Sequence, residues 1–107
     1  SSRKMNSEVL ILYTRKGCCL CQALEKKLSN ICLKKLKPSI VLSIVDIDSE
    51  KVSLDIQMKY TNEVPVIVLD SNLLLKKIEL PRVSPRLKED MLFYWIQKNL
   101  NILYKIS

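Results

Sequence analysis

The stretch Leu12–Cys21, which reads LYTRKGCCLC, places three cysteines within four positions at the junction of two expected elements. Before the cysteines, Glu8–Thr14 (EVLILYT) is an apolar run rich in β-forming residues, as is typical of a buried strand. After them, apolar residues recur at helical spacing and predict a helix from about Cys19 to Lys35. Cys18 and Cys21 are therefore expected at the mouth of that helix, about one turn apart.

Two more elements are predicted before the middle of the chain. Ser39–Asp48 (SIVLSIVDID) is almost entirely apolar, which predicts a strand buried on both faces. Asp48 or Ser49 can then cap a short helix that carries the apolar residues of Val52–Met58.

The second half of the chain predicts a hairpin and a final helix. Two strands, at about 64–70 and 73–80, are joined at Asp70-Ser71-Asn72, which is a turn signal. Ser84-Pro85 offers a cap with proline in the first helical turn. The helix that follows has a broad apolar face, expected to pack in the core, made of Leu87, Met91, Tyr94, Trp95 and Ile96.

The order of elements, βαβαββα, predicts an α/β fold. A helix between two strands makes a parallel crossover, whereas a tight turn makes its two strands antiparallel. We therefore expect a mixed four-stranded sheet flanked by helices on both faces. Residues 1–107 have room for a single domain, with residues 1–6 and 101–107 as peripheral tails.

The composition excludes several function classes. The chain has no histidine, which removes imidazole-based hydrolase chemistry, and only one glycine, which rules out a glycine-rich phosphate loop. The net charge of +7, much of it in lysine pairs, suits a surface that steers anionic partners. No nucleic-acid-binding motif is present, and we expect the protein not to bind nucleic acid.

The apolar segments are short, which bears on location. The run Val9–Tyr13 is too short for the core of a signal peptide, and nothing approaches a membrane span. We therefore expect a cytoplasmic monomer without a membrane partner, in a compartment that keeps ordinary thiols reduced.

The position of Cys18 predicts a reactive thiol. A residue just ahead of a helix faces unpaired backbone N–H groups and the positive end of the helix dipole, and Arg15 and Lys16 add positive charge. All of these favour the thiolate, which is the attacking form of cysteine. Cys18 is thus the expected nucleophile, and Cys21 is expected to resolve the mixed disulfide that forms on it.

Two alternatives use the same cysteines differently. Cys18, Cys19 and Cys21 could hold a soft metal or an iron–sulfur cluster, although a fourth ligand would have to be Cys32, far along the expected helix. The dithiol could instead act as a redox switch in a non-catalytic interaction module, in which Arg82 and Arg86 could bind an oxyanion. The simplest role for Cys19 is to fill a helical position, and Cys32 is expected to be a small buried residue. No metal site is predicted.

A strand, a C-x-x-C motif at a helix start and a later valine-proline before a hairpin together resemble the thioredoxin fold. Within that fold the chain is similar to the short glutaredoxin-like proteins, through LYTRKGCCLC (Leu12–Cys21), VDID (Val45–Asp48) and EVPVIVL (Glu63–Leu69). The resemblance implies a thiol–disulfide oxidoreductase that acts on protein or low-molecular-weight disulfides. It also implies that Pro65 follows a cis peptide bond and faces the cysteines, and that Val64 binds the substrate backbone.

The sequence departs from the glutaredoxin pattern where glutathione would bind. Cys19-Leu20 replaces the usual residues between the two active cysteines, and ELPRVSPRLKED (Glu79–Asp90) stands where glutaredoxins hold the γ-glutamyl end of glutathione. Arg15 occupies the place of the lysine that pairs with a glutathione carboxylate, and Lys16 adjoins it. We expect no bound cofactor and leave the use of glutathione open.

Overall fold

The structure is a computed structural model that describes residues 8–36, 39–84 and 86–105. Along the chain, its elements are β1 (Glu8–Thr14), α1 (Cys19–Asn30), the 3₁₀ turn η1 (Leu33–Lys35), β2 (Ile40–Asp46), α2 (Leu54–Tyr60), β3 (Val66–Ser71), β4 (Lys76–Glu79) and α3 (Glu89–Tyr104). Among the described residues, no helix combines the length and the apolarity that crossing a bilayer requires.

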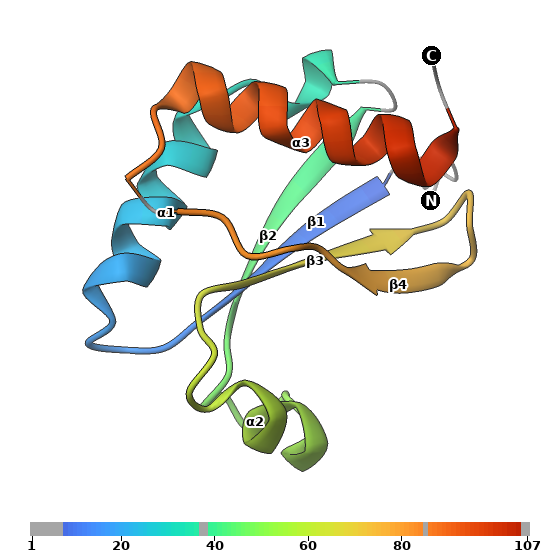
Figure 1. Ribbon diagram of the computed structural model, residues 1–107. Coiled ribbons are helices and arrows are strands. Elements are labelled where there is room, and N and C mark those ends of the chain that lie inside the picture. The colour runs from blue at the N-terminus through green and yellow to red at the C-terminus, as the bar shows by residue number, and fades with distance from the viewer. Residues whose placement is uncertain (1–7, 37–38, 85, 106–107) are drawn as a thin grey trace, which may run out of the picture.

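The four strands form one mixed sheet in the order β2-β1-β3-β4. β1 runs parallel to β2, with Glu8 opposite Ile40 and Thr14 opposite Asp46. β3 is antiparallel to both β1 and β4. Helices α1 and α3 cover one face of the sheet and α2 covers part of the other (Figure 1). The predicted α/β sheet with helices on both faces is confirmed.

Alternate residues of β1 supply two cores, one on each face of the sheet. Leu10 and Leu12 belong to the larger core, which also contains Leu24 of α1 and Ile96 of α3. The second core lies against α2 and comprises Ile11, Tyr13, Ile47, Tyr60, Val66 and Val68. Because strand side chains alternate between faces and both faces are covered at β1, which lies between β2 and β3, nearly all of its side chains are buried. This places the chain that leads to the cysteines on a rigid support.

The prediction that the second strand is buried on both faces is wrong. β2 is an edge strand, and Val41 and Ile44 are 50% and 40% exposed. The crossover through α1 puts β2 outside β1, while β3 takes the other side of β1. The outer edge of β2 therefore has no neighbouring strand among the described residues.

The first helix is shorter than its apolar pattern suggested. It ends at Asn30, and the backbone at Ile31 is already extended, although its N–H still bonds to Lys27 O. Cys32 lies beyond the helix at the start of η1 and is exposed, so its predicted burial is wrong. Without the last turn of that helix, Cys32 does not share a face with Cys21.

The last helix also differs from the prediction at its start and on its surface. Ser84 forms a turn, in which its backbone oxygen and its Oγ accept bonds from Leu87 N and Arg86 N, and α3 begins only at Glu89. Met91 and Tyr94 were expected in the core but are 51% and 67% exposed. Trp95, which was also expected there, does pack against the core.

Three remaining boundaries fall within a few residues of the expected ones, and two residue groups lie outside the described part. Ser53 caps α2 by accepting from Ile56 N, in place of the expected Asp48 or Ser49. The turn of the hairpin is 72–75, slightly later than predicted. α3 runs on to Tyr104, so residues 101–104 of the expected C-terminal tail belong to the helix. The predicted tail 1–6 and Pro85 lie outside the described residues.

A buried carboxylate ties the end of α3 to the sheet. Glu8 is fully buried, and its carboxylate accepts hydrogen bonds from the hydroxyl of Tyr104 and from the N–H groups of Asn72 (2.8 Å) and Leu73 (3.1 Å). The Tyr104 hydroxyl also lies 3.0 Å from Ser71 Oγ. We call Glu8, Ser71 and Tyr104 the Glu8 cluster. It lies at the end of the sheet that is remote from the cysteines.

Candidate functional site

Cys18 and Cys21 are joined by a disulfide at the start of α1, with their Cα atoms 5.2 Å apart. Cys18 is the N-cap residue, and its Sγ accepts a hydrogen bond from Cys21 N at 3.1 Å. Cys18 is half-buried, whereas Cys21 is 1% exposed. A substrate in solution can therefore reach the first sulfur but not the second.

The loop before Cys18 turns the chain so that its sulfur meets the helix start. Gly17 has a left-handed backbone (φ 80°), which a residue without Cβ adopts freely, and Cys18 N donates to Arg15 O at 3.2 Å. The first turn of α1 contains no acidic residue. The N–H groups and the dipole of the helix therefore act on Sγ of Cys18 without competition from a carboxylate in that turn, and they favour a negative charge there.

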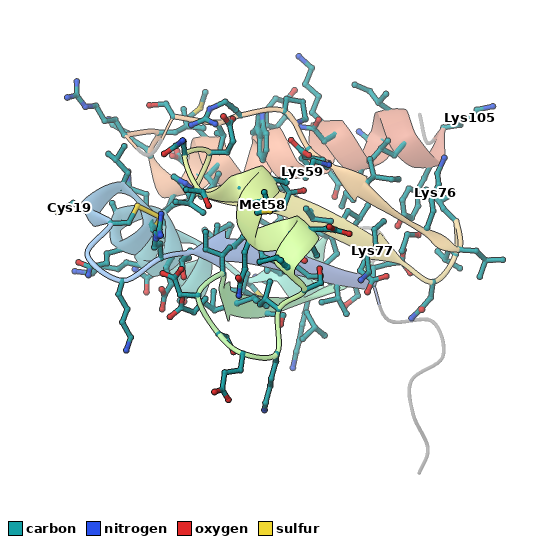
Figure 2. The ribbon with its side chains drawn as sticks, turned by 90° about the horizontal axis from the view of Figure 1, so that it is seen from below. Cys19, Met58, Lys59, Lys76, Lys77 and Lys105 are labelled. Carbon is teal, nitrogen blue, oxygen red and sulfur yellow. A yellow bond between two sulfur atoms is a disulfide. The ribbon has the colours of Figure 1, made fainter. Side chains whose placement is uncertain are left out.

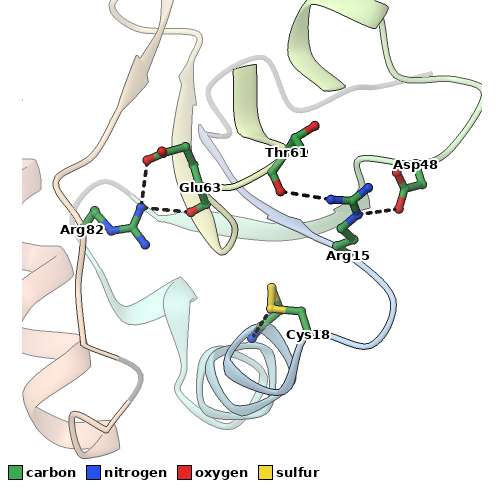
Figure 3. The surroundings of a disulfide bond; sticks show 7 residues. Arg15, Cys18, Asp48, Thr61, Glu63 and Arg82 are labelled. Atoms are coloured by element: carbon green, nitrogen blue, oxygen red, sulfur yellow. Dashed lines mark hydrogen bonds and ion pairs between the residues drawn. A yellow bond between two sulfur atoms is a disulfide. The ribbon is translucent and has the colours of Figure 1, made fainter. Parts of the chain in front are cut away.

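Arg15, which was predicted to bind substrate, is bonded within the protein. Its Nε lies 3.0 Å from a carboxylate oxygen of Asp48, and its Nη1 donates to Thr61 O at 3.1 Å. It thus ties the cysteine loop to the segments after β2 and after α2 (Figure 3). Asp48 competes for the cation that would pair with a glutathione carboxylate. Lys16, the next residue after Arg15, is exposed.

The peptide bond between Val64 and Pro65 is cis, as predicted. Both residues are half-buried, and Val64 N donates to Tyr60 O at 3.2 Å. A cavity of about 300 Å³ is lined by Leu20, Pro65, Arg82, Val83 and Ser84. Since Leu20 lies between Cys18 and Cys21 in sequence, this cavity brings the start of α1 and the cis-proline together.

Arg82, for which the sequence suggested an oxyanion-binding role, is bonded to Glu63 within the protein. Its Nη1 donates to the backbone oxygen of Glu63 at 3.0 Å and to the Glu63 carboxylate at 3.1 Å. Figure 3 shows Arg82 and Glu63 on one side of Cys18, and Arg15 with its partners on the other. Arg82 thus holds the chain directly before Val64-Pro65. A basic residue shortly after the hairpin was the only sequence signal for it.

Leu20 was missed as a site residue. It is 55% exposed and lines the same cavity as Pro65. Its place between the two cysteines was the available signal.

The remaining thiols do not complete a metal site. Cys19 and Cys32 are both free and exposed. Cys32 lines a separate hollow between the end of α1 and β2, together with Ile31, Leu33 and Val41. In the part of the chain that the structure describes, no three cysteine or carboxylate side chains are grouped as metal ligands would be.

Comparison with known proteins agrees with this geometry. Residues 9–97 match the family described as Glutaredoxin-like domain (DUF836). No curated protein matches the sequence significantly.

Among solved structures, thioredoxin-2 of the malaria parasite, a component of its protein secretion machinery, is 22% identical, with 87% of this chain and 84% of that one covered and a TM-score of 0.58. A mutant thioredoxin from Halobacterium salinarum NRC-1 is also 22% identical, with 87% and 74% covered and a TM-score of 0.56. Trxlp from Edwardsiella tarda EIB202 is 15% identical, with 84% and 82% covered and a TM-score of 0.55. At these identities the likeness establishes the thioredoxin fold.

Proposed function

The chain belongs to the glutaredoxin-like domain family, and from that premise we propose that it is a thiol–disulfide oxidoreductase in which Cys18 attacks and Cys21 resolves. One observation carries the proposal. The disulfide joins a half-buried cysteine to a buried one, and Leu20 between them lines the same cavity as the cis-proline. The structure corresponds to the oxidised end of the cycle.

The cycle begins after a dithiol, or two thiols, has reduced the Cys18–Cys21 bond with two electrons. The Cys18 thiolate attacks one sulfur of a substrate disulfide, and the other substrate sulfur leaves as a thiolate. Cys21, deprotonated, then attacks Sγ of Cys18 in the mixed disulfide. The intramolecular bond forms again, and the second substrate thiolate is released. The substrate gains the two electrons that the protein loses.

The surroundings have separate parts in this cycle. The N–H of Cys21, which donates to Sγ of Cys18, stabilises the thiolate both before attack and as leaving group. Leu20, Pro65 and Val83 offer an apolar surface to the residues that flank a substrate sulfur. Val64 takes part through its carbonyl oxygen, because its N–H already donates to Tyr60. Arg15 positions the loop, and Lys16 attracts anionic substrates.

Protein and low-molecular-weight disulfides are the substrates that we propose, with the cytoplasm as the location and a monomer as the active form. A half-buried sulfur beside an open cavity accepts either kind of substrate. Because Arg15 is bonded to Asp48, glutathione has less to bind here than the sequence suggested.

The decisive experiment compares the four cysteines one at a time. Disulfide reduction is assayed for Cys18→Ser and Cys21→Ser, with Cys19→Ser and Cys32→Ser as matched controls that remove free thiols. We expect Cys18→Ser to abolish turnover, Cys21→Ser to accumulate a mixed disulfide visible by mass spectrometry, and both controls to retain activity. Full activity of Cys18→Ser would refute the assignment, and inactivity of the intact protein toward every disulfide would favour a redox-switched binding module.

A further inference from the structure

Two strongly exposed leucines project from the turn between β3 and β4. The turn is 72–75, and within it Leu73 is 53% exposed and Leu75 is 87% exposed. Figure 1 shows this hairpin extending from the end of the sheet where α3 also ends. The same end carries the Glu8 cluster.

The turn is held firmly by hydrogen bonds, so a loose loop does not explain the exposure of the two leucines. Glu8 accepts from the N–H groups of Asn72 and Leu73, and Ser71 Oγ accepts from Leu74 N at 2.9 Å. Leu75 has a left-handed backbone (φ 56°), a conformation that favours glycine or asparagine and is costly for a leucine. The protein thus presents a large apolar side chain in water where a smaller residue would fold more easily.

Three exposed lysines lie close to this turn in the chain or at the same end of the molecule: Lys76 and Lys77 follow the turn in β4, and Lys105 follows α3. Figure 2 shows Lys76 and Lys105 at the same end of the molecule. None of the three forms an ion pair with another described residue. Asp70 lies opposite Lys77 in the strand register and offsets part of its charge, so Lys76 and Lys105 carry most of the uncompensated charge.

We propose that this hairpin tip, formed by Leu73, Leu75, Lys76, Lys77 and Lys105, docks on the surface of a bilayer that contains anionic lipids. The leucines would enter the interfacial region and the lysines would lie among the head groups. Apolar side chains on a projecting turn suit a soft surface that they can penetrate, whereas a protein partner would need a matching pocket. The charge of the lysines complements anionic lipid. The sequence-based expectation of no membrane partner concerned spanning segments and did not consider this surface.

The proposal leaves the redox site accessible. Cys19, next to the nucleophile, lies at the end of the molecule opposite Lys76 and Lys105 (Figure 2). A protein docked by its hairpin tip would therefore present the dithiol away from the lipid.

Vesicle co-sedimentation tests the proposal with the whole protein. Vesicles of phosphatidylcholine alone are compared with vesicles that also contain phosphatidylserine, at low and high salt. One variant combines Leu73→Ser with Leu75→Asn, and a second combines Lys76→Gln with Lys105→Gln. Leu54→Ser, at a 67% exposed leucine on α2, and Lys34→Gln with Lys35→Gln are the matched controls. Thermal unfolding of each variant verifies that it is folded.

We expect sedimentation with the phosphatidylserine vesicles that weakens with salt, as screened charges require. Loss of both tip lysines should weaken binding at least tenfold, since each contributes about fivefold. Loss of both tip leucines should weaken it by more than tenfold, while the controls bind as the unchanged protein does. Failure to sediment, equal losses in the controls, or no effect of the leucine variant would overturn the proposal. Tip-dependent binding to polyglutamate without any binding to vesicles would assign the surface to an acidic protein instead.

Discussion

Replacing the buried carboxylate of the Glu8 cluster should destabilise the fold without touching the dithiol. In Glu8→Gln the side chain keeps its shape and one carbonyl oxygen for the N–H groups of Asn72 and Leu73, but its amide nitrogen faces the Tyr104 hydroxyl. Three charge-assisted hydrogen bonds become neutral or poorly matched, and each change costs about 1 kcal/mol. We therefore expect a loss of about 2–3 kcal/mol, a large share of the roughly 5–15 kcal/mol that stabilises a domain of this size.

The effect should depend on pH with a definite sign. Burial acts to raise the pKa of the Glu8 carboxyl, but hydrogen bonds from Ser71, Tyr104 and the backbone of Leu73 and Asn72 together hold that pKa below its ordinary value of 4.5. The unfolded chain therefore binds this proton more readily than the folded one, and the contribution of Glu8 is complete above the ordinary pKa. It is lost as the pH falls through the lower pKa of the folded state. The difference between Glu8→Gln and the unchanged protein should shrink over that acid range.

Denaturant unfolding followed by circular dichroism measures both effects, from neutral pH down into the acid range. Glu50→Gln, which removes an exposed carboxylate, is the matched control and should change stability by less than about 0.5 kcal/mol. Equal stabilities of Glu8→Gln and Glu50→Gln at neutral pH would refute the reasoning. So would a deficit in Glu8→Gln that stays constant as Glu8 itself becomes protonated.

Three further outcomes follow from the same contacts. Tyr104→Phe removes a donor to Glu8 and should cost about 1–2 kcal/mol in denaturant unfolding, whereas Tyr94→Phe, at an exposed position of the same helix, should be neutral. Burial, with a hydrogen bond to Glu8 in one case and to Glu79 in the other, raises the pKa of Tyr104 and of Tyr60 to about 12. Both values exceed the ordinary tyrosine pKa of about 10, so the free energy of unfolding should be unaffected by these groups below pH 10 and should fall as the pH rises from there toward 12. Tyrosinate absorbance should rise over the same interval. A loss of stability that begins at neutral pH would contradict this. Arg15→Gln breaks a partly exposed ion pair and should cost less than about 1 kcal/mol, yet it should speed hydrogen exchange in the cysteine loop; unchanged exchange would show that Arg15 does not hold that loop.

Local patterns predicted the parts of the fold that are decided locally. The continuous apolar run of β1 identified a buried strand, because a strand in a sheet covered on both faces buries nearly every side chain. The spacing of Cys18 and Cys21 at a helix start, with Val64-Pro65 downstream, was specific enough to identify the family.

The same reasoning failed for β2, because an apolar parallel strand has the same sequence pattern at the edge and in the middle of a sheet. Position in the sheet depends on which side of β1 the crossover takes, and that is a property of the whole chain. Cys32 was misplaced for a related reason, since the helical spacing continued through residues where the backbone had already left the helix.

Contacts between distant segments account for what the sequence could not predict at the site. Arg15 meets Asp48 across 33 residues, and Arg82 meets Glu63 across 19. Charged residues are common in this chain, and composition alone does not say which pairs form. Glu8 was equally hidden, because its partners are mainly backbone N–H groups of a turn more than 60 residues away.

The two borders of the sheet will behave differently when many copies of the protein are crowded together. β4 has four residues and carries Lys76 and Lys77, which discourage another chain from adding a strand there. β2 has seven residues, with Asp46 its only charged one, and it leaves Val41 and Ile44 uncovered. Concentrated stocks should therefore associate along β2 and precipitate slowly on storage. Val41→Lys should extend their shelf life, and Val41 lies on the edge of the sheet opposite β4.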